Sequence, residues 1–178
     1  PTGHPDFAGI MDDTIALRDK YCPGAKVSVL SNSTFIDRPQ VHAALMKVDN
    51  NILKLDTVNP EYIKKVDRPT YPTYDVKKII EGIRSFNGHA IIQTMFMHGS
   101  FTRRQKDGTT EVIDVSNTDE KFVAPWLDAV KYIAPEEVMV YTIDRETPDH
   151  DLKKATHEEL DAIRDRVIAL GIPCTASY

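Results

Sequence analysis

Apolar and polar residues follow two different rhythms along this chain. Apolar residues three and four apart indicate helices packed on one side, and they occur at residues 6–21, 39–46, 61–66, 75–86, 118–133 and 156–170. Short apolar runs indicate buried strands, and they occur at residues 26–30, 51–55, 89–95, 137–143 and 172–177. Because helical and extended segments alternate from one end to the other, the pattern predicts the order α(βα)4β.

Local signals mark the ends of the first and last helices. Pro23 and Gly24 end the first helix. The last helix begins with a capping box formed by Thr156 and Glu159, and Gly171 ends it. The apolar stripes that these helices are expected to bury are Phe7, Ile10, Met11, Leu17 and Tyr21 in the first, and Leu160, Ile163, Val167 and Leu170 in the last.

One segment interrupts the alternation. Residues 99–117 are mostly polar, and Asp107 and Gly108 predict a tight hairpin turn within them. The helix that follows is expected to begin at a cap formed by Asn117 or Thr118.

The order of elements bounds the fold class. Strands joined by helical crossovers run parallel, and the crossovers are right-handed. We therefore expect an α/β fold, with residues 1–178 as a single domain and a parallel sheet with outer helices. The sheet is either open and doubly wound or part of a barrel, and five strands are too few to close a standard barrel of eight.

Composition excludes several classes of protein. The chain is 41% hydrophobic and 28% charged, which is typical of a folded domain and not of a disordered one. Its formal net charge of −5 does not give the general basic surface of a nucleic-acid binder. No apolar run approaches the roughly 20 residues that cross a bilayer, and the first residues lack the features of a signal peptide. We expect a cytoplasmic protein without a membrane partner.

Metal and nucleotide motifs are missing from the sequence. The two cysteines, Cys22 and Cys174, lie far apart and cannot form a four-thiolate site, so we interpret both as small structural residues. The histidines have no HExxH spacing, and no GxGxxG, GxxxxGK[ST] or GxSxG motif is present. We therefore expect no metal ligands within this chain.

Candidate chemistry lies where the strands end. Ligands of parallel sheets bind at the carboxyl ends of the strands, and here these ends fall at residues 31–34, 54–57, 93–96 and 141–145. Asn32 and Ser33 offer amide and hydroxyl groups in the first window. Their alternative role is to cap the helix that follows.

Lys54 and Asp56 carry the sharpest signal. Strand alternation places both on one face and Leu53 and Leu55 on the other. A lysine within a parallel strand is unfavourable unless it is paired or faces a wet pocket. Either the two residues form a structural ion pair, or they hold a polar ligand, with Lys54 facing a carboxylate and Asp56 accepting from hydroxyls or an amine.

The remaining strand ends offer weaker candidates. Gln93 and Met95 share one face, and Gln93 is either a satisfied buried amide or a contact for adenine or ribose. Tyr141, Asp144 and Arg145 end the fourth strand, where Asp144 and Arg145 could equally form a surface ion pair.

Several segments together resemble one family. The quoted segments are SVLSNSTFIDRPQV, VDNNILKLDTV, VDRPTY, DVKKIIEGI, IIQTMFMHG and MVYTIDRETP. In this order they resemble successive parts of radical S-adenosylmethionine (radical SAM) proteins, in particular the wyosine-synthase-like Fe–S oxidoreductases. The start PTGHPDF resembles the end of that family's GGEPTLHPDF motif, which places Thr2 beside the cofactor's amino group.

The resemblance implies a partial TIM-type (βα)6 radical SAM barrel that lacks its first strands. It implies that a CxxxCxxC loop upstream of Pro1 holds a 4Fe-4S cluster, so that this fragment is inactive by itself. The full-length enzyme would reductively cleave S-adenosylmethionine (SAM) to a 5′-deoxyadenosyl radical, with flavodoxin or ferredoxin as reductant. The group includes tRNA modifiers, but the acidic charge gives no independent support for a tRNA substrate.

The resemblance also implies roles for the candidate residues. The cofactor-binding set would be Thr2, Asn32, Ser33, Lys54, Asp56, Gln93, Met95, Tyr141, Asp144 and Arg145. Within it, Lys54 would face the cofactor carboxylate, and Gln93 and Met95 would flank the adenosine. The family's GxIxGxxE-like element has no match here, and residues 99–117 would lie over the mouth of the barrel as a substrate or partner element.

Two other interpretations stay open. A degenerate α/β barrel domain would bind a small molecule or a protein without catalysis. Another TIM-type fragment acting on a phosphorylated metabolite would carry a glycine-rich phosphate loop late in the chain, and the sequence has none.

Overall fold

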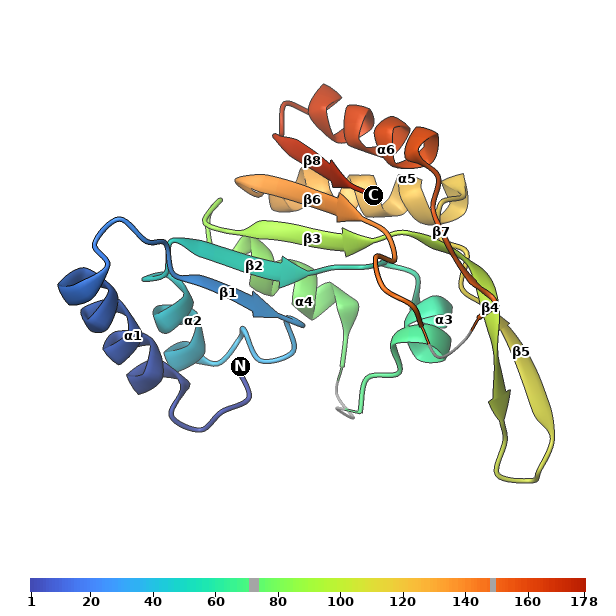
Figure 1. Ribbon diagram of the computed structural model, residues 1–178, viewed down its shortest axis with the longest axis horizontal. Coiled ribbons are helices and arrows are strands. Elements are labelled where there is room, and N and C mark those ends of the chain that lie inside the picture. Colours follow the sequence, from blue (N-terminus) through green and yellow to red (C-terminus); the bar gives the residue numbers. More distant parts are fainter. Residues whose placement is uncertain (71–73, 148–149) are drawn as a thin grey trace.

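A parallel five-stranded sheet forms the centre of the computed structural model, which describes residues 1–70, 74–147 and 150–178. The strand order is β1-β2-β3-β6-β8, and every neighbouring pair is parallel (Figure 1). The strands are β1 (Ser28–Ser31), β2 (Asn50–Lys54), β3 (Ile91–Met95), β6 (Glu137–Tyr141) and β8 (Cys174–Ser177). The predicted α/β fold with a parallel sheet and outer helices is confirmed.

Helices pack against one face of this sheet. They are α1 (Phe7–Tyr21), α2 (Pro39–Leu45), α4 (Val76–Arg84), α5 (Glu120–Ile133) and α6 (His157–Ala169). The main apolar core joins them to alternate strand residues such as Val29, Leu53, Ile92 and Val138. Within the described residues, no helix is both long and apolar enough to cross a membrane.

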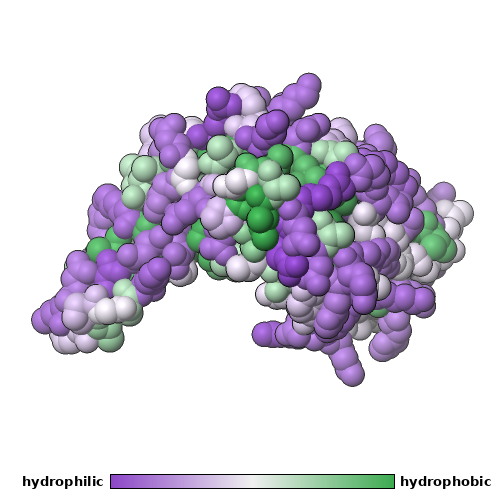
Figure 2. Space-filling model, turned by 90° about the horizontal axis from the view of Figure 1, so that it is seen from above, coloured by the Kyte–Doolittle hydropathy of each residue, from purple (hydrophilic) through white to green (hydrophobic). Residues whose placement is uncertain are grey.

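The opposite face of the sheet is partly open. Leu30 on this face is 50% exposed, and Gln93, Met139 and Tyr141 are half-buried. A parallel sheet is usually covered on both faces, so this exposure fits the inner side of an incomplete barrel. Figure 2 shows an arched, mostly hydrophilic surface with apolar residues gathered near its middle.

The polar segment forms a second, antiparallel sheet in the order β5-β4-β7. Its strands are β4 (Met97–Arg104), β5 (Thr110–Asp114) and β7 (Leu152–Lys154). The predicted hairpin turn is confirmed, since Gly108 has a φ of 87°. In Figure 1 the β4–β5 hairpin projects from the carboxyl end of β3. Strand β7 was not predicted from the sequence.

Gly99 allows β7 to approach β4 closely. Its φ is +97°, and a Cβ atom placed there would lie 2.0 Å from the carbonyl oxygen of Asp151. Only glycine fits this crossing without a shift of the backbone. The attachment of β7 to the hairpin therefore depends on the absence of a side chain at position 99.

The connection after β2 is a short helix, α3 (Pro60–Tyr62), followed by a π-helix (Ile63–Asp67). Asn59 caps α3 by accepting from the backbone N–H groups of Glu61 and Tyr62. The Tyr62 hydroxyl donates to the carbonyl oxygen of Val115 over 2.8 Å, which fixes this connection to the end of the hairpin.

Three details of the sequence prediction are wrong. Ile10, Leu17 and Tyr21 are 41%, 58% and 65% exposed, because α1 lies at the edge of the molecule and buries only Phe7 and Met11. Leu170 is 37% exposed, because it follows the last turn of α6 as its C-cap residue.

The third detail is the start of α5, whose N-cap is Asp119. The predicted cap Asn117 has another role, because its side chain accepts from the N–H of Met97 and donates to the carbonyl oxygen of Met95. The capping box of Thr156 and Glu159 is confirmed.

Candidate functional site

A chain of polar side chains joins the carboxyl ends of four neighbouring strands. Parallel strands end at the same edge of a sheet, and residues far apart in sequence therefore meet there. We call this set the strand-end cluster: Thr2, Ser31, Ser33, Lys54, Asp56 and Tyr141. Hydrogen bonds and one ion pair connect its members at this edge of the sheet.

Buried hydroxyl groups form one half of the cluster. The Thr2 and Ser31 hydroxyls lie 3.0 Å apart, and the Ser31 hydroxyl accepts from the backbone N–H of Ser33. The Ser33 hydroxyl donates to the carbonyl oxygen of Lys54 over 3.0 Å. Because Thr2, Ser31 and Ser33 are all buried, these bonds tie the N-terminal segment, β1 and β2 together.

The charged half of the cluster is centred on Lys54. Its Nζ lies 3.2 Å from Asp56 Oδ2 and donates to the Tyr141 hydroxyl over 2.8 Å. Asp56 Oδ1 accepts from the N–H of Met95 over 2.8 Å. Lys54 and Asp56 are 30% and 21% exposed, so the pair is half-buried at the end of β2.

Burial and pairing act against each other on the two charges. Burial lowers the pKa of Lys54, but the Asp56 carboxylate and the Tyr141 hydroxyl outweigh it and raise that pKa above its ordinary value. Burial raises the pKa of Asp56, while the Lys54 ammonium and the Met95 N–H oppose the rise. Lys54 is thus a cation held in a fixed direction.

A cavity of about 420 Å³ opens beside this pair. It is lined by Asn32, Thr34, Phe35, Lys54, Leu55, Asp56, Thr57, Asp67, Pro69, Thr70 and Tyr74. This volume suits a small ligand. Asn32, Lys54 and Asp56 are the predicted residues that reach the cavity, whereas Ser33 is fully buried and lines a separate cavity of about 80 Å³.

Asp67 and Tyr74 complete the outer wall of the cavity and were not predicted. Although Asp67 reaches solvent, partial burial and then the neighbouring Asp56 carboxylate raise its pKa to about 7. Burial and the carboxylate of Asp67 raise the pKa of Tyr74 to about 12. The signal that could have found Asp67 is its place in the connection that follows the carboxyl end of β2.

The other predicted residues divide into two groups. Gln93 and Met95 are half-buried on the open face, and Gln93 lies beside Lys54 in the sheet. Asp144 and Arg145 are exposed and line a separate hollow of about 400 Å³, so the structure does not bring them to the strand-end cluster.

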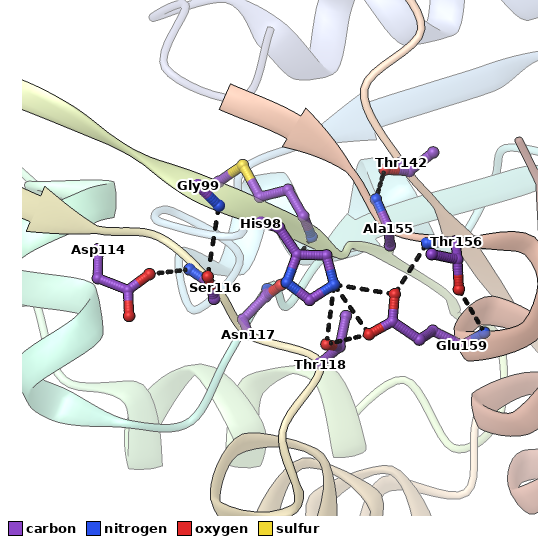
Figure 3. Close-up of polar contacts among 11 residues, drawn as sticks. His98, Gly99, Asp114, Ser116, Asn117, Thr118, Thr142, Ala155, Thr156 and Glu159 are labelled. Carbon is purple, nitrogen blue, oxygen red and sulfur yellow. Dashed lines mark hydrogen bonds and ion pairs between the residues drawn. The ribbon is translucent and has the colours of Figure 1, made fainter. Parts of the chain in front are cut away.

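A second polar cluster holds the hairpin to α6 (Figure 3). We call it the hairpin joint: His98, Thr118 and Glu159. His98 Nε2 lies 2.8 Å from both carboxylate oxygens of Glu159, and the Thr118 hydroxyl donates to Glu159 Oε1 over 2.8 Å. Glu159 also accepts from the N–H of Thr156 over 2.8 Å.

The charge of Glu159 is well stabilised. Burial raises its pKa, but hydrogen bonds from Thr156, His98 and Thr118 outweigh burial and lower the pKa to about 2. The sequence predicted Glu159 only as part of the capping box. The contact between Glu159 and His98 depends on β7, a short strand that the sequence pattern did not predict.

The described residues do not fit an iron–sulfur cluster. They contain no group of three or more His, Cys, Asp or Glu side chains placed to hold a metal. Cys22 is exposed at the end of α1, and Cys174 begins β8. Cys174 therefore lies at the amino end of its strand, whereas the strand-end cluster lies at the carboxyl ends.

Comparisons with known sequences give distant relatives. No protein-family model matches the chain. A UPF0026 protein from Helicobacter pylori strain J99 is 28% identical over 147 residues, which are 80% of this chain and 42% of the relative. The counterpart from strain 26695 is 27% identical over the same shares. The chain therefore spans about two-fifths of the length of the curated relatives it matches.

Solved structures share the fold. A domain of pyruvate-formate lyase-activating enzyme from Bacteroides vulgatus has a TM-score of 0.59 at 13% identity, covering 95% of this chain and 92% of that chain. A radical SAM methyltransferase from Sphaerobacter thermophilus has a TM-score of 0.59 at 16% identity, and the match covers 84% of this chain and 39% of that chain. Streptococcus suis SuiB bound to SAM has a TM-score of 0.60 at 13% identity, and the match covers 99% of this chain and 37% of that chain. The chain therefore has a fold found in radical SAM enzymes.

Proposed function

We propose that this chain is part of a radical SAM enzyme and that the strand-end cluster, with its cavity, binds SAM. The observation that carries the proposal is the half-buried Lys54, held by Asp56 and Tyr141 at the carboxyl ends of the strands. A structural neighbour with this fold was crystallised with SAM. Within the superfamily we propose the wyosine-synthase-like group, on the sequence segments alone.

The residues present fit such a ligand. SAM carries a carboxylate, an amino group and ribose hydroxyls, and the cavity offers an ammonium at Lys54, a carboxylate at Asp56 and an amide at Asn32. When bound and reduced, SAM supplies a 5′-deoxyadenosyl radical. The part of this chain is to orient the cofactor, because Asp56 and Tyr141 fix the direction of the Lys54 ammonium.

We propose that the 4Fe-4S cluster is bound by residues outside this chain, because the described residues do not fit one. The chain alone is then expected to bind SAM without cleaving it. Reductive cleavage, and electron delivery by a flavodoxin or ferredoxin, belong to the whole protein. We propose a cytoplasmic location for it.

SAM binding is tested by calorimetry on this chain. Lys54→Ala should weaken SAM binding by about tenfold to a hundredfold, since a hydrogen bond to a charged group contributes about 1.5–3 kcal/mol. Lys131→Ala, at an exposed position on α5, is the matched control and should bind like the wild type. Circular dichroism checks that both variants are folded.

Two outcomes would contradict the proposal. Equal SAM affinity in wild type and Lys54→Ala would show that Lys54 only pairs with Asp56. No heat of SAM binding to a folded wild-type chain would favour a domain that binds another ligand without catalysis. The whole protein is tested by anaerobic iron reconstitution with dithionite and SAM, where 5′-deoxyadenosine is the expected product.

A further inference from the structure

The outer wall of the cavity carries a carboxylate, Asp67, that does not contribute to the polar contacts of the fold among the described residues. Asp67 ends the π-helix after β2, and it lines the same cavity as Lys54 and Asp56. Across the described ranges 1–70, 74–147 and 150–178, the Asp67 side chain makes no hydrogen bond or ion pair. Asp67 is exposed to solvent on its outer side, so its carboxylate is accessible to a ligand.

The charges around the cavity do not balance. Lys54 and Asp56 form an ion pair, which leaves Asp67 as the one charged side chain without an ion-pair partner among the described lining residues. Partial burial and then the neighbouring Asp56 carboxylate disfavour the charged form of Asp67, and the Lys54 ammonium offsets only part of this. A positively charged group beside Asp67 would offset the repulsion between the two carboxylates.

The chemistry of the wall favours an organic cation over a metal ion. Both oxygens of Asp56 are engaged, Oδ1 by the Met95 N–H and Oδ2 by Lys54. A divalent cation needs several free oxygen ligands, whereas an ammonium group can be held by a single carboxylate. Two aromatic rings, Phe35 and Tyr74, line the same cavity and offer apolar surface to the rest of such a ligand.

We propose that Asp67 binds a cationic amino group of the substrate, a primary ammonium or a guanidinium, while Phe35 and Tyr74 pack against the adjoining apolar part. This inference rests on the proposed function, because it divides the cavity between two ligands. SAM would bind on the Lys54 side, and the amine-bearing substrate would bind on the Asp67 side. Asp67 is thus a specificity-determining residue of the same site.

The experiment uses phenethylamine and its neutral isostere phenethyl alcohol as probes, titrated into the chain and followed by amide chemical shifts in NMR. Phenethylamine should bind at millimolar concentration and about tenfold more tightly than the alcohol. Asp67→Asn should abolish this difference. Asp128→Asn makes the same charge change at an exposed position on α5, and it should leave the difference intact.

Three results would overturn the inference. The first is equal binding of the amine and the alcohol to the wild type. The second is an unchanged preference for the amine in Asp67→Asn. The third is a loss of SAM affinity in Asp67→Asn as large as in Lys54→Ala, which would place Asp67 in the cofactor half. SAM binding to the wild type without a preference for the amine contradicts only this inference, whereas absence of SAM binding to the folded wild type contradicts the proposed function.

Discussion

The strand-end cluster and the hairpin joint are both groups of hydrogen-bonded polar residues, but the carboxylates in and beside them have opposite pKa shifts. In the joint, Glu159 accepts from three neighbours, and its pKa is about 2. At the cavity of the strand-end cluster, partial burial and then the Asp56 carboxylate raise the pKa of Asp67 to about 7. One acid is stabilised as an anion by the fold, and the other is not.

This difference separates a structural contact from the proposed binding site. The hairpin joint has donors for its charge within the chain, so it can stabilise the fold without a ligand. The cavity has an ion pair and a further carboxylate without a donor among the described residues. Perturbed acids of the second kind are typical of functional sites. Mutations in the joint should therefore change stability, and mutations at the cavity should change binding.

The largest stability effect is expected at Gly99, next to the joint. Gly99→Ala places a Cβ atom 2.0 Å from the Asp151 carbonyl oxygen at a φ of +97°, and it should lower the free energy of unfolding by more than about 3 kcal/mol. Urea denaturation measures this loss. Gly108→Ala has a similar φ but no atom within 4 Å, and its loss should be near 1 kcal/mol. Equal losses would show that the crossing tolerates a side chain.

A smaller effect is expected at Glu159. Glu159→Gln removes the charge that pairs with His98 and should lower the free energy of unfolding by about 1 kcal/mol at pH 7. Glu158→Gln, at an exposed position in the same turn, is the control.

The pH dependence of this effect follows from the lowered pKa. Since the pKa of Glu159 falls from 4.5 to about 2 on folding, its contribution is present above pH 4.5 and is lost as the pH falls toward 2. The wild type and Glu159→Gln should therefore differ at pH 7 and converge near pH 2. A constant difference in thermal unfolding over this range would contradict the assignment.

The smallest stability effect, with the opposite sign, is expected at Asp67. Its pKa rises from 3.8 to about 7 on folding, so the folded state binds more protons and stability falls as the pH rises through that window. Asp67→Asn should remove this loss and raise the free energy of unfolding at pH 8 by about 0.5 kcal/mol or less, because the side chain reaches solvent. Thermal unfolding at pH 5 and pH 8 measures it. Destabilisation at pH 8 would show that Asp67 has a structural partner.

The sequence predicts the central sheet well because the fold there follows local patterns. Each parallel strand is a short apolar run, and strand alternation correctly places Lys54 and Asp56 together and Leu53 and Leu55, which are 0% and 2% exposed, in the core. The rule that ligands bind at the carboxyl ends of strands then leads to the cavity that contains Lys54 and Asp56.

The parts that were missed depend on contacts between distant segments. β7 is three residues long and has no apolar pattern, and it forms because Gly99 lets Asp151 approach. His98 and Glu159 are 61 residues apart in sequence, and Asn117 leaves its predicted cap position to bond Met95 and Met97. Such pairings are set by tertiary geometry, which periodicity cannot report.

The single tryptophan lies directly beneath the strand ends. Trp126 is 1% exposed, and its indole N–H donates to the carbonyl oxygen of Leu55 and to the Thr94 hydroxyl. Leu55 stands between Lys54 and Asp56 and lines the cavity. Because the chain has one tryptophan, its intrinsic fluorescence reports from one place only. The protein thus carries its own optical probe of ligand binding at the strand ends, without an added label.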